Sequence, residues 1–320
     1  MTQKIRLGIS QCLLGDKVRY DGGHKLDRFL TDILGEWVEY VPVCPEVECG
    51  LPVPRESMRL EGDPESPRLV TTRTKIDKTD QMTQWAQKRV AELEKENLLG
   101  FIFKSGSPSS GMERVKVYDR NGMPSKKGSG MFARAFMEHF PLLPVEEEGR
   151  LNDPALRENF IERIFTLARW REILSARKNR GGLVEFHTRH KLMILSHGTS
   201  YYRDMGRMVA QSKEIPIKEL FARYEESLLK ALKLMATTKK NTNVLMHMMG
   251  YFKRNLSADE KDELLQIIDF YRNGLVPLVV PLTLVNHYVR KYDQPYLRQQ
   301  YYLNPHPAEL QLRTKVLYAK

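Results

Sequence analysis

Apolar residues in the first half of the chain alternate between short dense runs and longer stretches with helical spacing. Residues 98–103 form a continuous apolar run of strand length, which is typical of a strand buried on both faces of a sheet. Similar runs predict strands at 4–10, 37–43, 69–72 and 142–145. Apolar residues spaced three and four apart predict helices at 25–34, 77–97 and 130–139.

Strands and helices that take turns in this way indicate an α/β fold with a largely parallel, Rossmann-like sheet. In such a sheet, ligands bind beyond the carboxyl ends of the strands. Three loops should meet there, and they carry Cys12, Cys44 and Lys104 at their starts. The sequence therefore predicts a site built from residues that lie far apart along the chain.

From about Asn152 onward the apolar spacing is helical throughout. Asp153 is expected to cap the first helix of this half. Six more helices are expected, at 183–197, 201–211, 217–237, 242–254, 257–273 and 276–292. The acidic turn at 146–149 favours a boundary between an α/β domain, residues 1–148, and an all-α domain, residues 149–320.

The net charge of +11 is distributed unevenly between these halves. Residues 1–150 hold 23 Lys and Arg and 23 Asp and Glu, so the whole basic excess lies in the helical half. A basic half-chain favours a polyanionic partner such as nucleic acid. A solvated basic surface without a partner is the alternative.

Membrane insertion and secretion are not expected. The N-terminus lacks the apolar core of a signal peptide. The apolar stretch 275–285 is interrupted by Pro277 and Pro281 and is too short to span a bilayer. We therefore expect a cytoplasmic protein without a membrane partner. The sequence also lacks a Gly-rich dinucleotide fingerprint, so neither a nicotinamide nor a flavin cofactor is expected.

The three cysteines, Cys12, Cys44 and Cys49, lie in or beside loops rich in glycine and proline. Their odd number, together with a reducing compartment, argues against a disulfide framework. A thiolate is both a soft metal ligand and a nucleophile. The set suits a [4Fe-4S] cluster, a zinc site with a fourth His or Asp ligand, or a thiol nucleophile, and the spacing leaves all three open.

Four motifs in order resemble the TudS-like thiouracil desulfidases, over about residues 4–145. They are QCLLG at 11–15, RYDG at 19–22, VCPE at 43–46 and KSGSPS at 104–109. In the second half, GLVEFHTRHK at 182–191 resembles the YbgA-type domain. The two domains fused in this order resemble the tRNA 4-thiouridine desulfidases.

The resemblance implies a [4Fe-4S] cluster held by three cysteines, with one iron left open for the sulfur of a thiolated pyrimidine. Water then replaces that sulfur, and sulfide leaves without a net redox change. The third loop departs from the family pattern, because Ser110 stands where the stand-alone desulfidases have a cysteine. Cys49 is the available replacement, so the expected ligands are Cys12, Cys44 and Cys49.

The resemblance also assigns roles to residues in the motifs. Glu46 matches the catalytic glutamate, with Glu48 as the alternative. Ser107 and then Ser109 are expected to polarise the base or relay a proton. Six further residues are expected to bind the pyrimidine: Arg19, Tyr20, Asp21, Lys104, Ser105 and Ser110.

Cations and tyrosines near the start of the helical half are the expected tRNA surface, because cations pair with phosphates and tyrosines stack on unpaired bases. They are Arg189, Lys191, Tyr201, Tyr202, Arg203 and Arg207. His187, His190 and His197 share one helix. We expect these histidines to be structural or to contact RNA rather than to bind a metal.

Two other functions remain open at this point. The protein is either a desulfidase of free thiouracil or thionucleotides, or a non-enzymatic RNA-binding protein with a structural or sensing metal site. Comparing the turnover of thiolated tRNA with that of free base distinguishes a tRNA desulfidase from a desulfidase of free thiouracil or thionucleotides. Replacing Glu46 distinguishes both desulfidase hypotheses from the non-enzymatic one, because a structural metal site should keep its function without this side chain.

Overall fold

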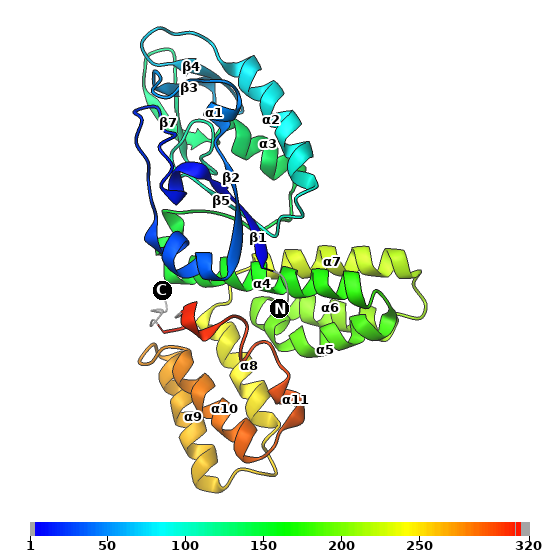
Figure 1. The fold of residues 1–320 in the computed structure, drawn as a ribbon. Coiled ribbons are helices and arrows are strands. Elements are labelled where there is room, and N and C mark those ends of the chain that lie inside the picture. The colour runs from blue at the N-terminus through cyan, green and yellow to red at the C-terminus, as the bar shows by residue number, and fades with distance from the viewer. Residues whose placement is uncertain (1–3, 311, 315–320) are drawn as a thin grey trace. The chain divides into compact units, whose positions relative to one another are not determined.

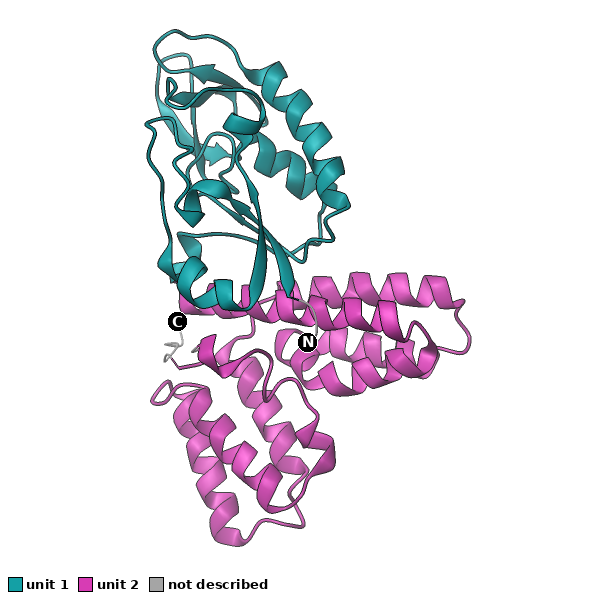
Figure 2. Cartoon of the chain, viewed as in Figure 1, with its two compact units in different colours: residues 1–152 teal, residues 153–320 magenta. Residues whose placement is uncertain are grey.

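The computed structural model describes residues 4–310 and 312–314. The chain divides into two compact units, residues 1–152 and residues 153–320 (Figures 1 and 2). The first is an α/β unit with a parallel sheet, and the second is helical, which confirms the predicted fold class. In the part of the chain that is described, no helix is long and apolar enough to cross a membrane.

The first unit is organised around a four-stranded parallel sheet with the order β2-β1-β5-β8. Its strands are β1 (Ile5–Ser10), β2 (Val38–Val43), β5 (Phe101–Phe103) and β8 (Val145–Glu147). The strands predicted at 4–10 and 37–43 are confirmed, and the one predicted at 98–103 is confirmed over Phe101–Phe103 only. The one predicted at 142–145 begins only at Val145, because Pro144 has no N–H to donate to the ladder.

Two helices cover one side of this sheet, α2 (Thr79–Glu94) and α3 (Met131–His139), as predicted (Figure 1). Phe101 and Phe103 of β5 are fully buried against Phe132 and Phe136 of α3, with ring centroids 4.8–6.2 Å apart. The approach is so close that a Cβ on Gly8 of β1 would lie 2.1 Å from the Phe101 ring. This aromatic core fixes where β1 and β5 end, and therefore where their loops begin.

A second sheet in the first unit has the order β4-β3-β6-β7. It consists of β3 (Met58–Asp63), β4 (Ser66–Thr71), β6 (Val115–Tyr118) and β7 (Pro124–Gly128). Two antiparallel hairpins are joined by a parallel pairing of β3 with β6. Only β4 was predicted, since the other strands mix charged, proline and glycine residues into a weak alternation.

The helix predicted at 25–34 is largely wrong. Lys25 and Asp27 donate their backbone N–H groups to the carbonyl oxygens of Cys12 and Leu13, at 2.8 and 3.0 Å. This segment is therefore tied to the loop after β1, and helical turns appear only at Phe29–Ile33 and Leu34–Glu36. A one-turn helix that was not predicted, α1 (Pro45–Glu48), follows β2.

The second unit contains helices α4 to α11. They span Pro154–Ala176, Arg180–His197, Thr199–Ala210, Ile217–Lys233, Thr238–Gly250, Ala258–Arg272, Val279–Lys291 and Pro295–Arg298. As predicted, Asp153 caps the first of them by accepting the N–H groups of Ala155 and Leu156. In the core of the second unit, the rings of Trp170 and Tyr224 stack with centroids 5.2 Å apart.

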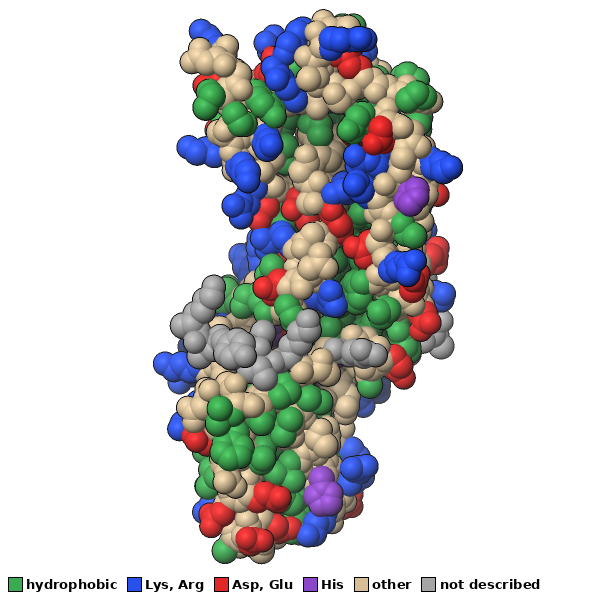
Figure 3. Space-filling model, turned by 90° about the vertical axis from the view of Figure 1, so that its left-hand side faces the viewer, with side chains coloured by type: hydrophobic (Ala, Val, Ile, Leu, Met, Phe, Trp, Pro, Cys, Tyr) green, Lys and Arg blue, Asp and Glu red, His purple; other side chains and the backbone are tan. Residues whose placement is uncertain are grey.

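Charged side chains of both signs are interspersed over the face of the molecule shown in Figure 3. The basic excess of the second unit does not form one continuous patch on that face.

The aromatic core predicts a large loss of stability when it is truncated. Phe136→Ala should lower the free energy of unfolding of the first unit by about 3–5 kcal/mol, because a large cavity is left beside β5. Denaturant titration measures this loss. The control Met123→Ala, at a side chain that is 67% exposed, should change the midpoint little; equal effects would contradict the assigned core.

Candidate active site

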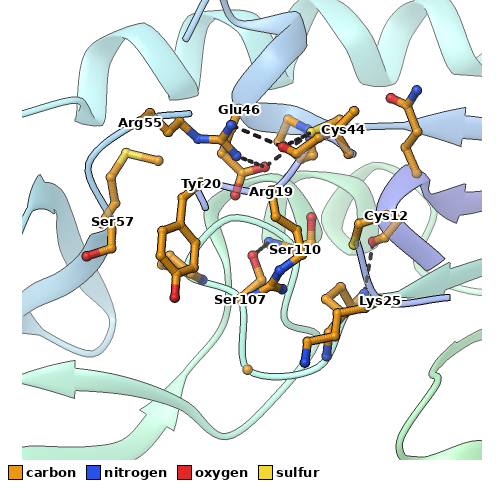
Figure 4. Close-up of a pocket in the computed structure, with 18 of the residues that line it drawn as sticks. Cys12, Arg19, Tyr20, Lys25, Cys44, Glu46, Arg55, Ser57, Ser107 and Ser110 are labelled. Carbon is orange, nitrogen blue, oxygen red and sulfur yellow. Dashed lines mark hydrogen bonds and ion pairs between the residues drawn. The ribbon is translucent and has the colours of Figure 1, made fainter. Parts of the chain in front are cut away.

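A pocket of about 430 Å³ lies at the carboxyl ends of β1, β2 and β5 (Figure 4). Its lining includes Cys12 from the loop after β1, Cys44 and Glu46 from the loop after β2, and Ser107 and Ser110 from the loop after β5. The structure thus brings together the three loops that the parallel sheet predicted. Of the residues expected to bind the pyrimidine, Arg19, Tyr20, Lys104 and Ser105 also line the pocket.

A line of hydrogen bonds runs from the pocket to Glu46. The Ser109 hydroxyl donates to Glu46 Oε1 at 2.5 Å, and the Ser107 and Ser109 hydroxyl oxygens lie 3.0 Å apart. Ser109 is fully buried, whereas Ser107 and Glu46 line the pocket. The three residues proposed from sequence as the proton-handling group are therefore in contact with one another.

The serine loop is held in place by the start of α3. Phe132 and Ala133 donate their backbone N–H groups to the Ser109 carbonyl, at 2.9 and 3.2 Å. A Cβ on Gly130 would lie 2.5 Å from the Ser109 carbonyl carbon. Only glycine at this position lets the loop lie so close to the helix, and this contact fixes Ser109 opposite Glu46.

Arg55 is a pocket residue that the sequence reasoning missed. Its Nη2 lies 3.8 Å from Glu46 Oε2, while Nη1 donates to the carbonyl oxygens of Val18 and Pro52, at 3.1 and 3.3 Å. The side chain is only 7% exposed. A nearly buried guanidinium compensates the charge of the Glu46 carboxylate and fixes its orientation. The sequence feature that could have pointed to Arg55 is that it is the single cation in the proline-rich stretch 50–55.

Cys12 and Cys44 are both buried in the walls of the pocket. Burial raises the pKa of Cys12 to about 11 and that of Cys44 to about 12, and the nearby Glu46 carboxylate adds to both shifts. Both are therefore neutral thiols in the metal-free protein at pH 7. The Cys44 sulfur also lies 3.7 Å from Glu46 Oε2.

Cys49, the third expected ligand, is not among the residues that line this pocket. Its sulfur donates to the Glu46 backbone carbonyl at 3.3 Å and packs against the apolar cluster that contains Leu60 and Leu69. The described residues contain no group of three His, Cys, Asp or Glu side chains arranged to hold a metal ion. Ser110, only 3% exposed, is one of the third-loop residues that line the pocket together with Cys12 and Cys44.

Several other candidates have structural partners. Lys104 Nζ pairs with Glu148, and Ser105 donates both its N–H and its hydroxyl to the same carboxylate, each at 2.7 Å. Asp21 does not line the pocket; it accepts the Gly23 N–H at 3.0 Å and shapes the turn. Glu48, the alternative to Glu46, accepts the Cys44 N–H at 2.9 Å and pairs with Arg89.

In the second unit, part of the expected tRNA surface lies along one open groove of about 600 Å³ on α5 and α6. Its lining includes Lys191, Tyr202, Arg203 and Arg207, but neither Tyr201 nor Arg189. Arg189 pairs with Glu185 instead, at 2.8 Å.

The three histidines of α5 are buried and engaged within the unit. His187 Nδ1 lies 3.0 Å from the Tyr224 hydroxyl, and His190 Nε2 accepts from Arg169 at 3.0 Å. His197 Nε2 lies 3.3 Å from Glu162. Burial lowers the pKa of His187 to about 4, so this imidazole is neutral at pH 7. These partners support the expected structural role.

The raised pKa values predict how the pocket thiols react in the metal-free protein. Alkylation of Cys12 and Cys44 should accelerate about tenfold per pH unit between pH 7 and 10, because the reactive thiolate is scarce below the raised pKa. Site-resolved mass spectrometry after timed alkylation measures these rates. A rate that levels off near pH 8.5, as for an ordinary thiol, would contradict the buried environment.

Comparisons with known proteins agree with this division of the chain. Residues 7–148 match the family described as 2-thiouracil desulfurase, and residues 191–307 match a protein family of unknown function, DUF1722. A relative from Escherichia coli (strain K12), "Uncharacterized protein YbgA", is 33% identical over 152 residues, which cover 47% of this chain and 90% of that protein.

Among solved structures, the [4Fe-4S]-dependent thiouracil desulfidase TudS is similar, with a TM-score of 0.40 and 29% identity. The match covers 48% of this chain and 98% of that one. The assignment of the two halves rests on the two family matches and on the similarity to the YbgA relative. The chain therefore belongs to the family in which a TudS-like 2-thiouracil desulfurase domain is followed by a YbgA-type domain.

Proposed function

We propose that the first unit hydrolytically removes sulfur from a thiolated pyrimidine, and that the substrate is 4-thiouridine in tRNA. The observation that carries the proposal is the hydrogen-bonded line Ser107–Ser109–Glu46, which leads from the pocket to a carboxylate beside the Cys44 thiol. The 2-thiouracil desulfurase family supports the reaction class.

In the reaction, one water adds its oxygen to the pyrimidine carbon and the C–S bond breaks. Both protons of that water end on the departing sulfide, so no electrons are exchanged. The Glu46 carboxylate takes a proton from the attacking water, and the resulting carboxylic acid returns it towards the sulfur. The Ser107 and Ser109 hydroxyls connect the pocket with Glu46, and they are placed to pass a proton between the two.

Arg55 and Lys104 prepare the site for this transfer. Arg55 lies beside Oε2 of Glu46 while Ser109 donates to Oε1, so the carboxylate keeps one orientation as its charge changes. Lys104 is held by Glu148 at the pocket wall, where its charge is partly compensated before substrate arrives. Both cations favour the negative charge that builds up on the sulfur as it leaves.

We further propose that an iron–sulfur centre binds in this pocket, because the solved TudS structure is described as [4Fe-4S]-dependent. Cys12 and Cys44 suit such a centre as thiolate ligands. The residues do not fit a cluster held by three cysteines with one open iron, because the Cys49 sulfur packs into the apolar cluster of the second sheet.

The α5–α6 groove is our proposed contact with the tRNA backbone. Lys191, Arg203 and Arg207 supply cations for phosphates, and Tyr202 supplies a ring for stacking. Free 2-thiouracil is the second candidate substrate, because the family name specifies it. With free base, the groove has no part in turnover.

Glu46→Gln tests the proton-handling role. The amide cannot accept a proton, so the rate of sulfide release should fall by about a hundredfold or more, while thiopyrimidine binding is kept. Anaerobic assays of sulfide release measure the loss. The control Glu65→Gln, at an exposed carboxylate elsewhere in the first unit, should retain activity. Full activity of Glu46→Gln would leave a structural or sensing metal site as the better account.

Reversing two charges in the groove tests the choice of substrate. Arg203→Glu with Arg207→Glu should raise KM for thiolated tRNA by about tenfold or more and flatten its salt dependence, because phosphate contacts are lost. Turnover of free 2-thiouracil should not change. The matched control is Arg223→Glu, at an exposed position on α7. If the double variant and the control behave alike on tRNA, the groove is not the contact surface.

A further inference from the structure

We infer that Ser110, and not Cys49, is the third protein donor beside Cys12 and Cys44, so that the pocket offers an iron–sulfur centre two thiols and one hydroxyl. This inference rests on the proposed function, since it concerns the ligands of the centre proposed there. It resolves the mismatch between a three-cysteine cluster and the two thiols that the pocket contains.

The three donors come from three different strand ends. Cys12 follows β1, Cys44 follows β2, and Ser110 belongs to the loop after β5. All three face the same hollow in Figure 4 and line the same pocket. Three donors on three loops surround a ligand, whereas Cys44 and Cys49 sit at opposite ends of the single helix α1.

The Ser110 hydroxyl is free to act as a donor, unlike those of its neighbours. Ser105 is bound to Glu148, while Ser107 and Ser109 are bound to each other and to Glu46. Within the described residues, Ser110 is held only through its backbone N–H, which donates to Ser107 Oγ at 3.2 Å. A nearly buried hydroxyl that faces a pocket without a partner is a site for a ligand.

The backbone around Ser110 is fixed, so this orientation is built into the fold. Gly111 donates to the Ser107 carbonyl at 2.8 Å, and Gly130 donates to the Gly111 carbonyl at 2.7 Å. A Cβ on Gly130 would lie 2.7 Å from the Ser110 nitrogen. The loop cannot turn Ser110 away without leaving the start of α3.

Cys49 is fixed in a different direction. Its N–H donates to the Pro45 carbonyl at 3.0 Å, and its carbonyl accepts from Gln81 of α2 at 2.8 Å. Its sulfur packs with Met58 and Trp85 around the apolar cluster of the second sheet. Turning that sulfur towards the pocket would break its contact with the Glu46 carbonyl and remove it from the apolar cluster.

A hydroxyl donor has chemical consequences that a thiol would not have. To bind iron, the Ser110 hydroxyl would have to give up its proton to solvent, as would the Cys12 and Cys44 thiols. Oxygen is a harder ligand than sulfur and matches the cluster irons less well. The centre should therefore leave this protein more readily than it would leave three thiolates.

Four variants of the full chain test the inference: Ser110→Cys, Ser110→Ala, Cys49→Ala and Cys12→Ala. Each is reconstituted anaerobically with iron and sulfide beside the wild-type chain. Iron and sulfide per chain and absorption near 400 nm are recorded, followed by the half-life of that absorption under a chelator. Circular dichroism of each variant before loading confirms that it is folded.

We expect Cys49→Ala to load and hold the centre like the wild type, while Cys12→Ala fails to load. Ser110→Ala should lose the centre faster than the wild type, and Ser110→Cys should hold it about tenfold longer, within the range by which a ligand environment changes metal affinity.

Three results would overturn the inference. Loss of the centre in Cys49→Ala, with Ser110→Ala unchanged, makes Cys49 the donor; the proposed function then stands if the wild type still desulfidates thiolated tRNA. If Ser110→Cys takes up the centre and the wild type does not, the hydroxyl is excluded as a ligand. Failure of the wild type and every variant to load removes the centre, and with it the cofactor part of the proposed function.

Discussion

The hydrogen bond from Ser109 to Glu46 is the interaction on which the site depends, because it joins two loops that follow different strands. It forms only because β1, β2 and β5 run parallel and end at one edge of the sheet. The Phe101–Phe136 core sets that edge, and the start of α3 holds the Ser109 carbonyl. A general acid–base group is thus built from positions 63 residues apart in the chain.

Burial gives the same site two different properties. It keeps the Cys12 and Cys44 thiols neutral until a cation binds them, because a thiolate is poorly solvated there. It also makes an uncompensated carboxylate costly, and the nearby Arg55 guanidinium together with the Ser109 hydroxyl offsets that cost at Glu46. The second unit uses buried charge differently: Arg313 pairs with Glu158 and Glu162 as part of its core, away from any proposed chemistry.

Much of this could be predicted from periodicity and loop chemistry. The strand at 98–103 was evident as a continuous apolar run, and the position of Cys12, Cys44 and Ser107 followed from the parallel sheet. The second sheet was not predicted, because β3 and β7 pair through backbone hydrogen bonds while their side chains are largely charged or polar. The direction of the Cys49 side chain depends on α1, a four-residue helix without a periodic signal.

The most direct test of the central claim is the balance of sulfur during anaerobic turnover. The reconstituted protein is incubated with 4-thiouridine-containing tRNA, and uridine formed, sulfide released and the mass of the protein are measured together. Our account predicts one uridine and one sulfide for each 4-thiouridine consumed, with no sulfur retained on the chain. A covalent adduct of the pyrimidine with Cys12 or Cys44, formed as the thiol displaces sulfide from the ring carbon, would show instead that a thiol attacks the substrate, and would contradict hydrolysis through Glu46.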